Sequence, residues 1–242
     1  MIGGSVSARF EELGWSPSPI GEVTLRRRVD PVSGLDVFEV KLGDEYLMSS
    51  MFTVGEVEVA RRALARLQGA ELDVVVGGLG LGYTAQEVLT DARVRDLVVV
   101  DALEPVIHWH EQGLVPVGPV LTGDPRCRFE LGDFFAMSDG AGFDPATRGR
   151  RFDAVIVDID HSPRHQLADG NDGFYGVEGT RRLAAHVRPG GVYSLWSNDP
   201  PDEQYLAVLR QVFTDVVADV VRFPNPLQDR EATNTVYLAT AR

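Results

Sequence analysis

The sequence lacks the features that mark secreted, membrane-bound or nucleic-acid-binding proteins. A single cysteine, Cys127, excludes an internal disulfide framework. No apolar run reaches bilayer-spanning length, and residues 1–10 lack the apolar core of a signal peptide, so we expect a cytoplasmic protein. Acidic residues outnumber basic ones by 36 to 23, and the net charge of −13 argues against nucleic acid and anionic membranes as partners. Small neutral or cationic molecules remain as candidate partners.

The length of the chain and its early strand pattern suggest two parts. With 242 residues the chain can bury one sizeable core without disulfides or metals. Residues 23–25 and 37–40 are strand-like, and the turn-forming segment 30–34 between them predicts a β-hairpin. We therefore expect a β-rich segment over residues 1–55 and a Rossmann-like nucleoside-binding transferase domain over residues 56–242.

Apolar strands alternate with helical patterns in the second part. This alternation predicts an α/β fold with a mainly parallel sheet, closed by an antiparallel pair at its edge. Ligands of such sheets bind beyond the carboxyl ends of the strands, so the residues that follow each strand are the site candidates. We expect strands at 74–76, 97–100, 127–131, 154–157, 192–196, 216–222 and 235–239, and helices at 56–68, from 83, from about 104, at 178–187 and at 203–212.

A glycine-rich turn follows the first of these strands. Glycines at 78, 80 and 82 would let a ligand approach the backbone. Asp101 ends the next strand about twenty residues further along the chain, which is the sequence spacing at which dinucleotide-binding folds place the acid that binds the ribose hydroxyls. A tight strand-to-helix connection without a ligand would use similar glycines. Tyr83 stands where a G-x-G-x-x-G motif has its last glycine, so a nucleoside without pyrophosphate fits better than NAD or FAD.

Taken together, these residues resemble the spermidine synthase family, aminopropyltransferases that share the class I S-adenosylmethionine-dependent methyltransferase fold. The resemblance implies that Asp101 bonds the ribose hydroxyls, that Asp133 accepts from the adenine amino group and that Asp158 faces the reacting centre. Phe134 would cover a face of the base. The matching segments are the β-rich N-terminal segment, the glycine turn with Glu87 downstream, Asp101 with 104–107, Gly132 with Asp133, 152–158 and 188–191.

Three departures from the family pattern bear on the chemistry. Leu81 stands where the family has an Asp that holds the aminopropyl ammonium of decarboxylated S-adenosylmethionine. His161 stands where the family has a second Asp, although Asp160 lies one position earlier. The polyamine-binding Gln and Tyr of the family have no evident counterparts in residues 46–52.

The Leu81 departure favours intact S-adenosylmethionine, which retains a carboxylate. An Asp about 4 Å from that carboxylate would cost roughly 4 kcal/mol at an effective dielectric of 20, and leucine removes this cost. We therefore predict an S-adenosylmethionine-dependent methyltransferase that acts on a small-molecule acceptor. Two alternatives stay open: a polyamine aminopropyltransferase that uses decarboxylated S-adenosylmethionine, and a non-catalytic nucleoside-binding protein.

The candidate site residues follow from these positions. Asp158, Asp160 and His161 are the catalytic candidates, because their segment leaves a buried strand and enters the expected cleft. Trp196 and Asn198 end a later strand and are candidates for the acceptor pocket. We expect no metal, a small-molecule acceptor as partner, and a homodimer as the assembly to consider. The expected cofactor contacts are Gly78, Gly80, Leu81, Gly82, Asp101, Asp133 and Phe134.

Overall fold

The N-terminal part of the chain forms a four-stranded antiparallel sheet. The computed structural model describes residues 10–18, 20–167, 171–225 and 230–242. The predicted hairpin is confirmed as β2 and β3, but the first strand was not predicted, because most of its side chains are exposed and show no apolar alternation. The strands pair in the order β1 (Phe10–Ser18), β2 (Gly21–Val29), β3 (Asp36–Leu42) and β4 (Glu45–Ser49).

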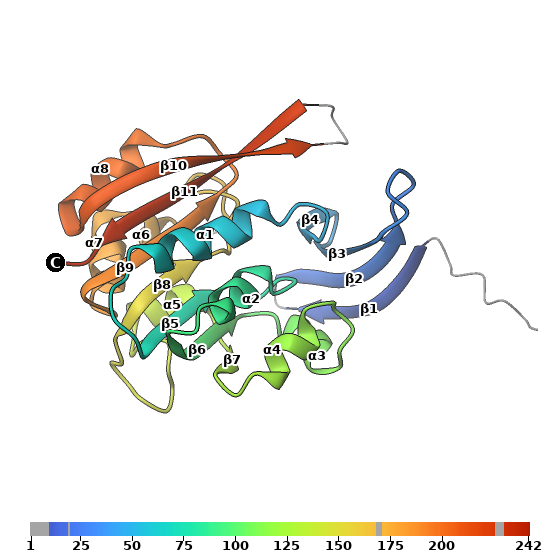
Figure 1. The fold of residues 1–242 in the computed structure, drawn as a ribbon, viewed down its shortest axis with the longest axis horizontal. Coiled ribbons are helices and arrows are strands. Elements are labelled where there is room, and N and C mark those ends of the chain that lie inside the picture. The colour runs from blue at the N-terminus through green and yellow to red at the C-terminus, as the bar shows by residue number, and fades with distance from the viewer. Residues whose placement is uncertain (1–9, 19, 168–170, 226–229) are drawn as a thin grey trace, which may run out of the picture.

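The main sheet has seven strands in the order β10-β11-β9-β8-β5-β6-β7 (Figure 1). Strands β5 to β9 are parallel, and β11 and β10 continue the sheet antiparallel to β9 and to each other, as predicted. The bounds are β5 (Leu72–Gly77), β6 (Val94–Asp101), β7 (Cys127–Leu131), β8 (Phe152–Val157), β9 (Val187–Ser197), β10 (Thr214–Asn225) and β11 (Arg230–Thr240).

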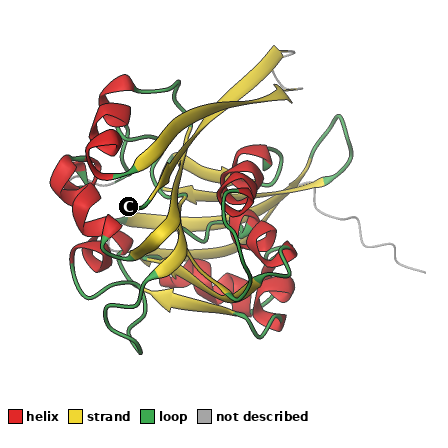
Figure 2. Cartoon of the chain, turned by 60° about the vertical axis from the view of Figure 1, so that its left-hand side comes forward, coloured by secondary structure: helices red, strands yellow, loops and turns green. Residues whose placement is uncertain are grey.

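Helices cover both faces of this sheet (Figure 2). Three short helices, α4, α5 and α6, were not predicted, since four to six residues are too few to show a helical period. The helices are α1 (Val54–Ala65), α2 (Tyr83–Thr90), α3 (Glu104–Glu111), α4 (Gly118–Gly123), α5 (Phe134–Asp139), α6 (Asp172–Tyr175), α7 (Val177–Ala184) and α8 (Glu203–Val212).

The strand sequences explain the two covered faces. In β5, Val74 and Val76 pack into one apolar cluster, while Val75 between them packs into the cluster on the opposite face. This is the alternation expected of a pleated strand buried on both sides. Val23 and Val40 of the N-terminal sheet belong to the first cluster, so that sheet shares a core with the main sheet. The proposed boundary near residue 55 stays a prediction.

One strand begins earlier than expected. β9 starts at Val187, five residues before the predicted 192, and the predicted helix 178–187 ends at Ala184. Gly190 has φ +76°, and the pairing with β8 shifts register between Phe152 and Ala154. The Arg-Pro-Gly-Gly segment is therefore an irregularity inside the strand, although its composition is typical of a turn.

Charged side chains form ion pairs at the amino edge of the main sheet. Asp73, near the start of β5, is 1 % exposed and contacts Arg95, Arg150 and Arg188. Three guanidinium groups hold the pKa of this carboxyl below its usual range, against the opposite effect of burial. Acids at this edge are thus neutralised by arginines.

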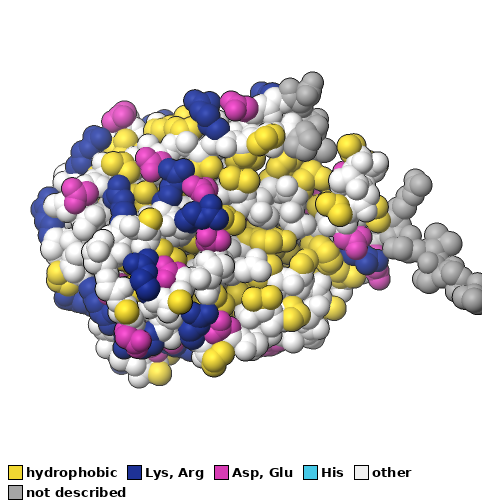
Figure 3. Space-filling view, viewed as in Figure 1, with side chains coloured by type: hydrophobic (Ala, Val, Ile, Leu, Met, Phe, Trp, Pro, Cys, Tyr) yellow, Lys and Arg dark blue, Asp and Glu magenta, His cyan; other side chains and the backbone are white. Residues whose placement is uncertain are grey.

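The outer surface mixes charges of both signs. On the face seen in Figure 3, acidic and basic side chains lie interspersed, whereas hydrophobic side chains gather toward the N-terminal sheet. In the part of the chain that the structure describes, no helix is long and apolar enough to cross a membrane.

The strand order places a ligand site at the carboxyl edge. From β5 the chain proceeds to β6 and β7 on one side, then returns to place β8 and β9 on the other. Connections therefore diverge above β5 and β8, which is where open α/β sheets bind ligands. The N-terminal sheet lies beyond this edge, at the right of Figure 1.

Candidate active site

A cavity of about 200 Å³ lies where the sheet topology predicts a ligand site. Residues that follow β5, β6, β7 and β8 form one side, and apolar side chains of the N-terminal sheet, including Val40, Leu47 and Met48, form another. No lysine or arginine lines it among the described residues. Five carboxylates do: Glu56, Asp101, Asp133, Asp158 and Asp160.

The glycine turn serves packing as well as ligand access. Gly78 has φ +94°, and a Cβ there would lie 2.1 Å from the backbone oxygen of Asp158. Gly82 has φ +90°, and its Cβ would lie 2.8 Å from His110 and from Leu121. The protein itself fills the space at these two positions, so packing requires these glycines, as the alternative of a tight strand-to-helix connection predicts. Gly78 and Gly80 line the cavity, whereas Gly82 does not.

Asp101 lies at the end of β6 and organises the turn opposite. Its Oδ2 accepts from the backbone N–H of Leu79 at 2.8 Å, and its Oδ1 accepts from that of Leu103 at 2.8 Å. Burial raises the pKa of this carboxyl, and the backbone N–H groups act in the opposite direction. A carboxylate has about four acceptor sites, so Asp101 retains capacity for a ligand hydroxyl.

Asp133 lies at the end of β7 and caps helix α5. Its Oδ1 accepts from the backbone N–H of Phe135 at 2.9 Å and of Ala136 at 3.2 Å. Asp133 itself lines the cavity. The neighbouring Phe134 ring is 2 % exposed and stacks on Phe143 at 4.4 Å between centroids, so it forms part of the cavity floor.

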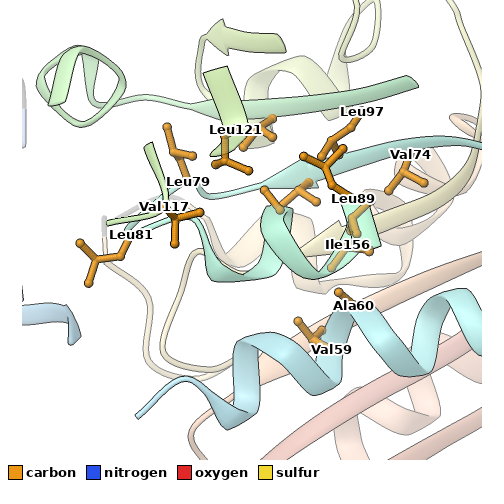
Figure 4. Close-up of a cluster of buried hydrophobic side chains, with 14 of the residues drawn as sticks. Val59, Ala60, Val74, Leu79, Leu81, Leu89, Leu97, Val117, Leu121 and Ile156 are labelled. Carbon is orange, nitrogen blue, oxygen red and sulfur yellow. The ribbon is translucent and has the colours of Figure 1, made fainter. Parts of the chain in front are cut away.

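Leu81 lies in the core and not on the cavity wall. Its side chain is 0 % exposed and belongs to the apolar cluster that includes Val117 and Leu121 (Figure 4). Its backbone N–H donates to Sδ of Met48 at 3.0 Å. The side chain at this position therefore does not face a ligand, which removes the physical basis of the preference for intact S-adenosylmethionine.

Two acids lie together on one side of the cavity. Glu56 comes from the first turn of α1, and Asp158 follows β8. Burial, and secondarily the charge of Asp158, raises the pKa of Glu56 to about 8. Burial raises the pKa of Asp158 to about 6, although Thr84 donates a hydrogen bond to its Oδ2 at 2.6 Å. Both carboxyls therefore hold their protons more strongly than free carboxyls do.

Asp160 also borders the cavity but is engaged by its own loop. It is 1 % exposed, and it accepts from the Tyr175 hydroxyl at 2.8 Å and from the backbone N–H of Leu167 at 2.8 Å. Burial raises the pKa of this carboxyl. These contacts show Asp160 shaping the loop that follows β8.

His161 faces the N-terminal sheet across the cavity. Its Nε2 lies 2.8 Å from Oε1 of Glu45, and its backbone oxygen accepts from the Asn198 N–H at 2.7 Å. His161 lines the cavity. His165 instead contacts Asp199 at 2.7 Å and is not part of the cavity wall.

The two acceptor-pocket candidates differ in placement. Trp196 lines the cavity, and its buried indole Nε1 has no hydrogen-bond partner among the described residues. Asn198 is outside the cavity wall, and its Oδ1 accepts from Asn234 at 3.3 Å. Within the described ranges, no three His, Cys, Asp or Glu side chains are grouped so that they could hold a metal ion.

Sequence reasoning missed Glu56 and Thr84. A carboxylate in the first turn of a helix is common, because it favours the helix dipole, so Glu56 carried no specific signal. Thr84 follows the glycine turn, and its hydroxyl reaches the end of the neighbouring strand. Its position just inside a strand-to-helix turn was the available clue.

Comparison with known proteins supports the resemblance. No family model matches the chain. Polyamine aminopropyltransferase 2 of Pseudomonas aeruginosa is 30% identical over 162 residues, which cover 60% of this chain and 40% of that protein. Polyamine aminopropyltransferase of Pyrobaculum islandicum is 26% identical over 150 residues, covering 62% of this chain and 49% of the relative. The match thus spans less than half the length of these curated relatives.

Solved structures show the same fold. A spermidine synthase in complex with the transition state analogue AdoDATO gives a TM-score of 0.70 at 16% identity, covering 95% of this chain and 73% of that one. Spermidine synthase from Thermotoga maritima gives 0.68 at 15% identity, covering 95% and 72%. The predicted α/β fold and the resemblance to the spermidine synthase family are confirmed.

The prediction of methyl transfer is wrong. The curated relatives are polyamine aminopropyltransferases, and the structural neighbours are spermidine synthases. The error came from placing the Leu81 side chain at the ligand, whereas it is buried in the core.

Proposed function

We propose that the chain is an aminopropyltransferase that uses decarboxylated S-adenosylmethionine and a small amine acceptor. The observation that carries this proposal is the charge of the cavity: five carboxylates and, among the described lining residues, no lysine or arginine. Such a site favours cationic ligands, and both a sulfonium donor and a polyamine are cations. The likeness to polyamine aminopropyltransferases supports it.

The order of the strands supports a nucleoside with a cationic tail. Four residues lie at or just after the carboxyl ends of β8, β5, β6 and β7, which are consecutive neighbours in the sheet: Asp158, Gly78, Asp101 and Asp133. At about 4.8 Å per strand, Asp158 and Asp133 lie at strand ends roughly 14 Å apart. Asp133 and Asp101 would accept from the adenine amino group and the ribose hydroxyls, and the tail would extend toward Asp158.

The proposed reaction places few demands on the protein beyond alignment and proton transfer. When bound, decarboxylated S-adenosylmethionine supplies a carbon activated by sulfonium: the acceptor nitrogen forms a bond to it while the C–S bond breaks and its electron pair stays on sulfur. Phe134 and the apolar wall of Val40 and Leu47 exclude water from that position. The acceptor nitrogen must lose a proton to the protein.

His161 is the proposed proton acceptor. With its Nε2 donating to Glu45, the lone pair resides on Nδ1, and the carboxylate stabilises the imidazolium that forms. Asp160 serves as a positioning residue, since its oxygens are bonded to Tyr175 and Leu167.

The test is an assay of the purified protein with decarboxylated S-adenosylmethionine and a series of diamines that begins with putrescine. We expect release of 5′-methylthioadenosine that depends on the amine, and no methyl transfer when intact S-adenosylmethionine replaces the donor. Donor binding without turnover for any amine would favour the non-catalytic alternative. Tighter binding of the intact cofactor would contradict the proposal.

A further inference from the structure

The start of α1 is pressed against the end of β9, which fixes Glu56 at the cavity. A Cβ on Gly55 would lie 2.3 Å from Nε1 of Trp196 and 2.6 Å from Oδ1 of Asn234. Only glycine fits here, so the helix begins close to the indole ring that lines the cavity. Glu56, the next residue, lines the cavity together with Trp196.

Glu56 differs from the next acid on the same helix. Glu58 pairs with Arg61 at 2.8 Å and with Arg62 at 2.7 Å. Among the described residues, neither Glu56 nor Asp158 has a basic side chain within ion-pair distance, although they are close enough to affect each other's titration. Two neighbouring half-buried acids without a basic partner repel each other when both are ionised, and such an arrangement is typical of a site that binds a cation.

The position of Glu56 and Asp158 in the cavity indicates which part of a ligand they would contact. Asp158 follows β8, on one side of β5, whereas the ribose candidate Asp101 is the last residue of β6, on the other side. Thr84, whose hydroxyl donates to Asp158, is the second residue of α2, the helix after the glycine turn. The pair therefore lies across the turn from the nucleoside half of the cavity.

We propose that Glu56 and Asp158 together bind the terminal ammonium of the aminopropyl group, with Glu56 supplying the carboxylate that the buried Leu81 cannot. This inference rests on the proposed function, because it assumes a nucleoside donor with an aminopropyl tail. It assigns Glu56 as a determinant of specificity for a cationic tail over the zwitterionic tail of intact S-adenosylmethionine.

Ligand binding at the two acids should also release a proton, which can be measured separately from affinity. The groups that face Glu56 are Asp158 after β8 and Tyr83 on α2, whose own pKa is raised mainly by burial. With a pKa of about 8, Glu56 carries a proton at pH 7 in the empty cavity. An ammonium between the two acids replaces that proton, so binding releases about one proton to the buffer.

The experiment compares two adenosine thioethers that lack the sulfonium charge of the donor and differ only in the tail. One is 5′-deoxy-5′-(3-aminopropylthio)adenosine, and the other is 5′-methylthioadenosine, which lacks the ammonium. In titration calorimetry, Glu56→Gln should weaken binding of the aminopropyl compound by about 10-fold to 100-fold, as expected for a lost hydrogen bond to a charged group. Binding of 5′-methylthioadenosine should stay unchanged.

Glu58→Gln on the same helix is the matched control and should leave both affinities unchanged. Calorimetry in buffers of different ionisation enthalpy should show proton release with the aminopropyl compound for the wild-type chain and its loss in Glu56→Gln. Equal weakening of both compounds, or unchanged proton release, would overturn the role of Glu56. Failure of the wild-type chain to bind either compound would instead overturn the proposed function.

Discussion

The imidazole Nε2 of His161 lies 2.8 Å from Oε1 of Glu45, so the loop after β8 is tied to the first residue of β4 across the cavity. This contact joins the two sheets at the place where the proposed proton transfer occurs. The carboxylate fixes both the ring orientation and the tautomer of the histidine.

Removing that carboxylate should slow turnover without weakening donor binding. We expect Glu45→Gln to lower kcat roughly tenfold, a part of the 10²-fold to 10⁴-fold that a general base contributes. Steady-state kinetics would measure this change in kcat. Asp44→Asn, an exposed acid next to it, is the control. An unchanged kcat in Glu45→Gln would contradict the assignment of His161.

Gly78→Ala should be more damaging than an alanine at another left-handed glycine. Gly69 has φ +85° with no atom within 4 Å of its built Cβ, so Gly69→Ala should lose only about 1 to 2 kcal/mol of unfolding free energy. At Gly78 the Cβ would also meet the Asp158 oxygen, and we expect a loss of about 2 to 5 kcal/mol. Urea unfolding of both variants gives the comparison. Equal losses of unfolding free energy in the two variants would mean that the ends of β5 and β8 move apart without an energetic cost.

Leu81→Asp should destabilise the fold rather than create an amine clamp. The side chain is 0 % exposed, so an acid there would bury a charge without a partner and cost about 3 to 5 kcal/mol. Leu81→Met, which nearly conserves volume, should cost less than about 1.5 kcal/mol. Denaturant unfolding measures the first effect, and titration with decarboxylated S-adenosylmethionine tests whether affinity rises. A folded, tighter-binding Leu81→Asp variant would show that this side chain can face the cavity.

Glu56 should make the unfolding free energy depend on pH in the neutral range. Its folded pKa, about 8, is above the unfolded value of 4.5, so the native state holds the proton more strongly. Between pH 4.5 and 8 the unfolded chain has lost that proton, and stability falls as pH rises, with a slope of up to about 1.4 kcal/mol per pH unit. Urea unfolding should show that Glu56→Gln removes this component, whereas Glu58→Gln retains it. Parallel pH profiles for the wild-type chain and Glu56→Gln would contradict the shift.

The sequence predicted the main sheet well because its signal is local. Runs such as 74–76 and 154–157 are apolar throughout, as expected of strands buried on both faces, and a glycine or an acid after each run marks the ligand edge. This pattern was sufficient to predict that Asp101, Asp133 and Asp158 share one edge of the sheet, and all three line the cavity. Their roles toward a ligand stay predictions.

The direction of individual side chains could not be predicted in the same way. Position 81 lies between two glycines of positive φ. Each of them changes the direction of the backbone, so the direction of the Leu81 side chain cannot be inferred from the sequence pattern. Glu56 depends on the packing of Gly55 against Trp196, two residues separated by about 140 positions in the chain. Such a contact leaves no local pattern.

The two edges of the main sheet differ in how their acids are compensated. Asp73 at the amino edge is surrounded by arginines, whereas Glu56 and Asp158 at the carboxyl edge have no basic side chain within ion-pair distance in the described part of the chain. We therefore expect the potential to become more negative toward the cavity mouth, through the acids that line it other than the protonated Glu56. A cation that diffuses nearby is drawn to this edge, so association should be faster than for a neutral analogue at low salt. The two rates should converge as the Debye length shrinks toward about 3 Å in 1 M salt.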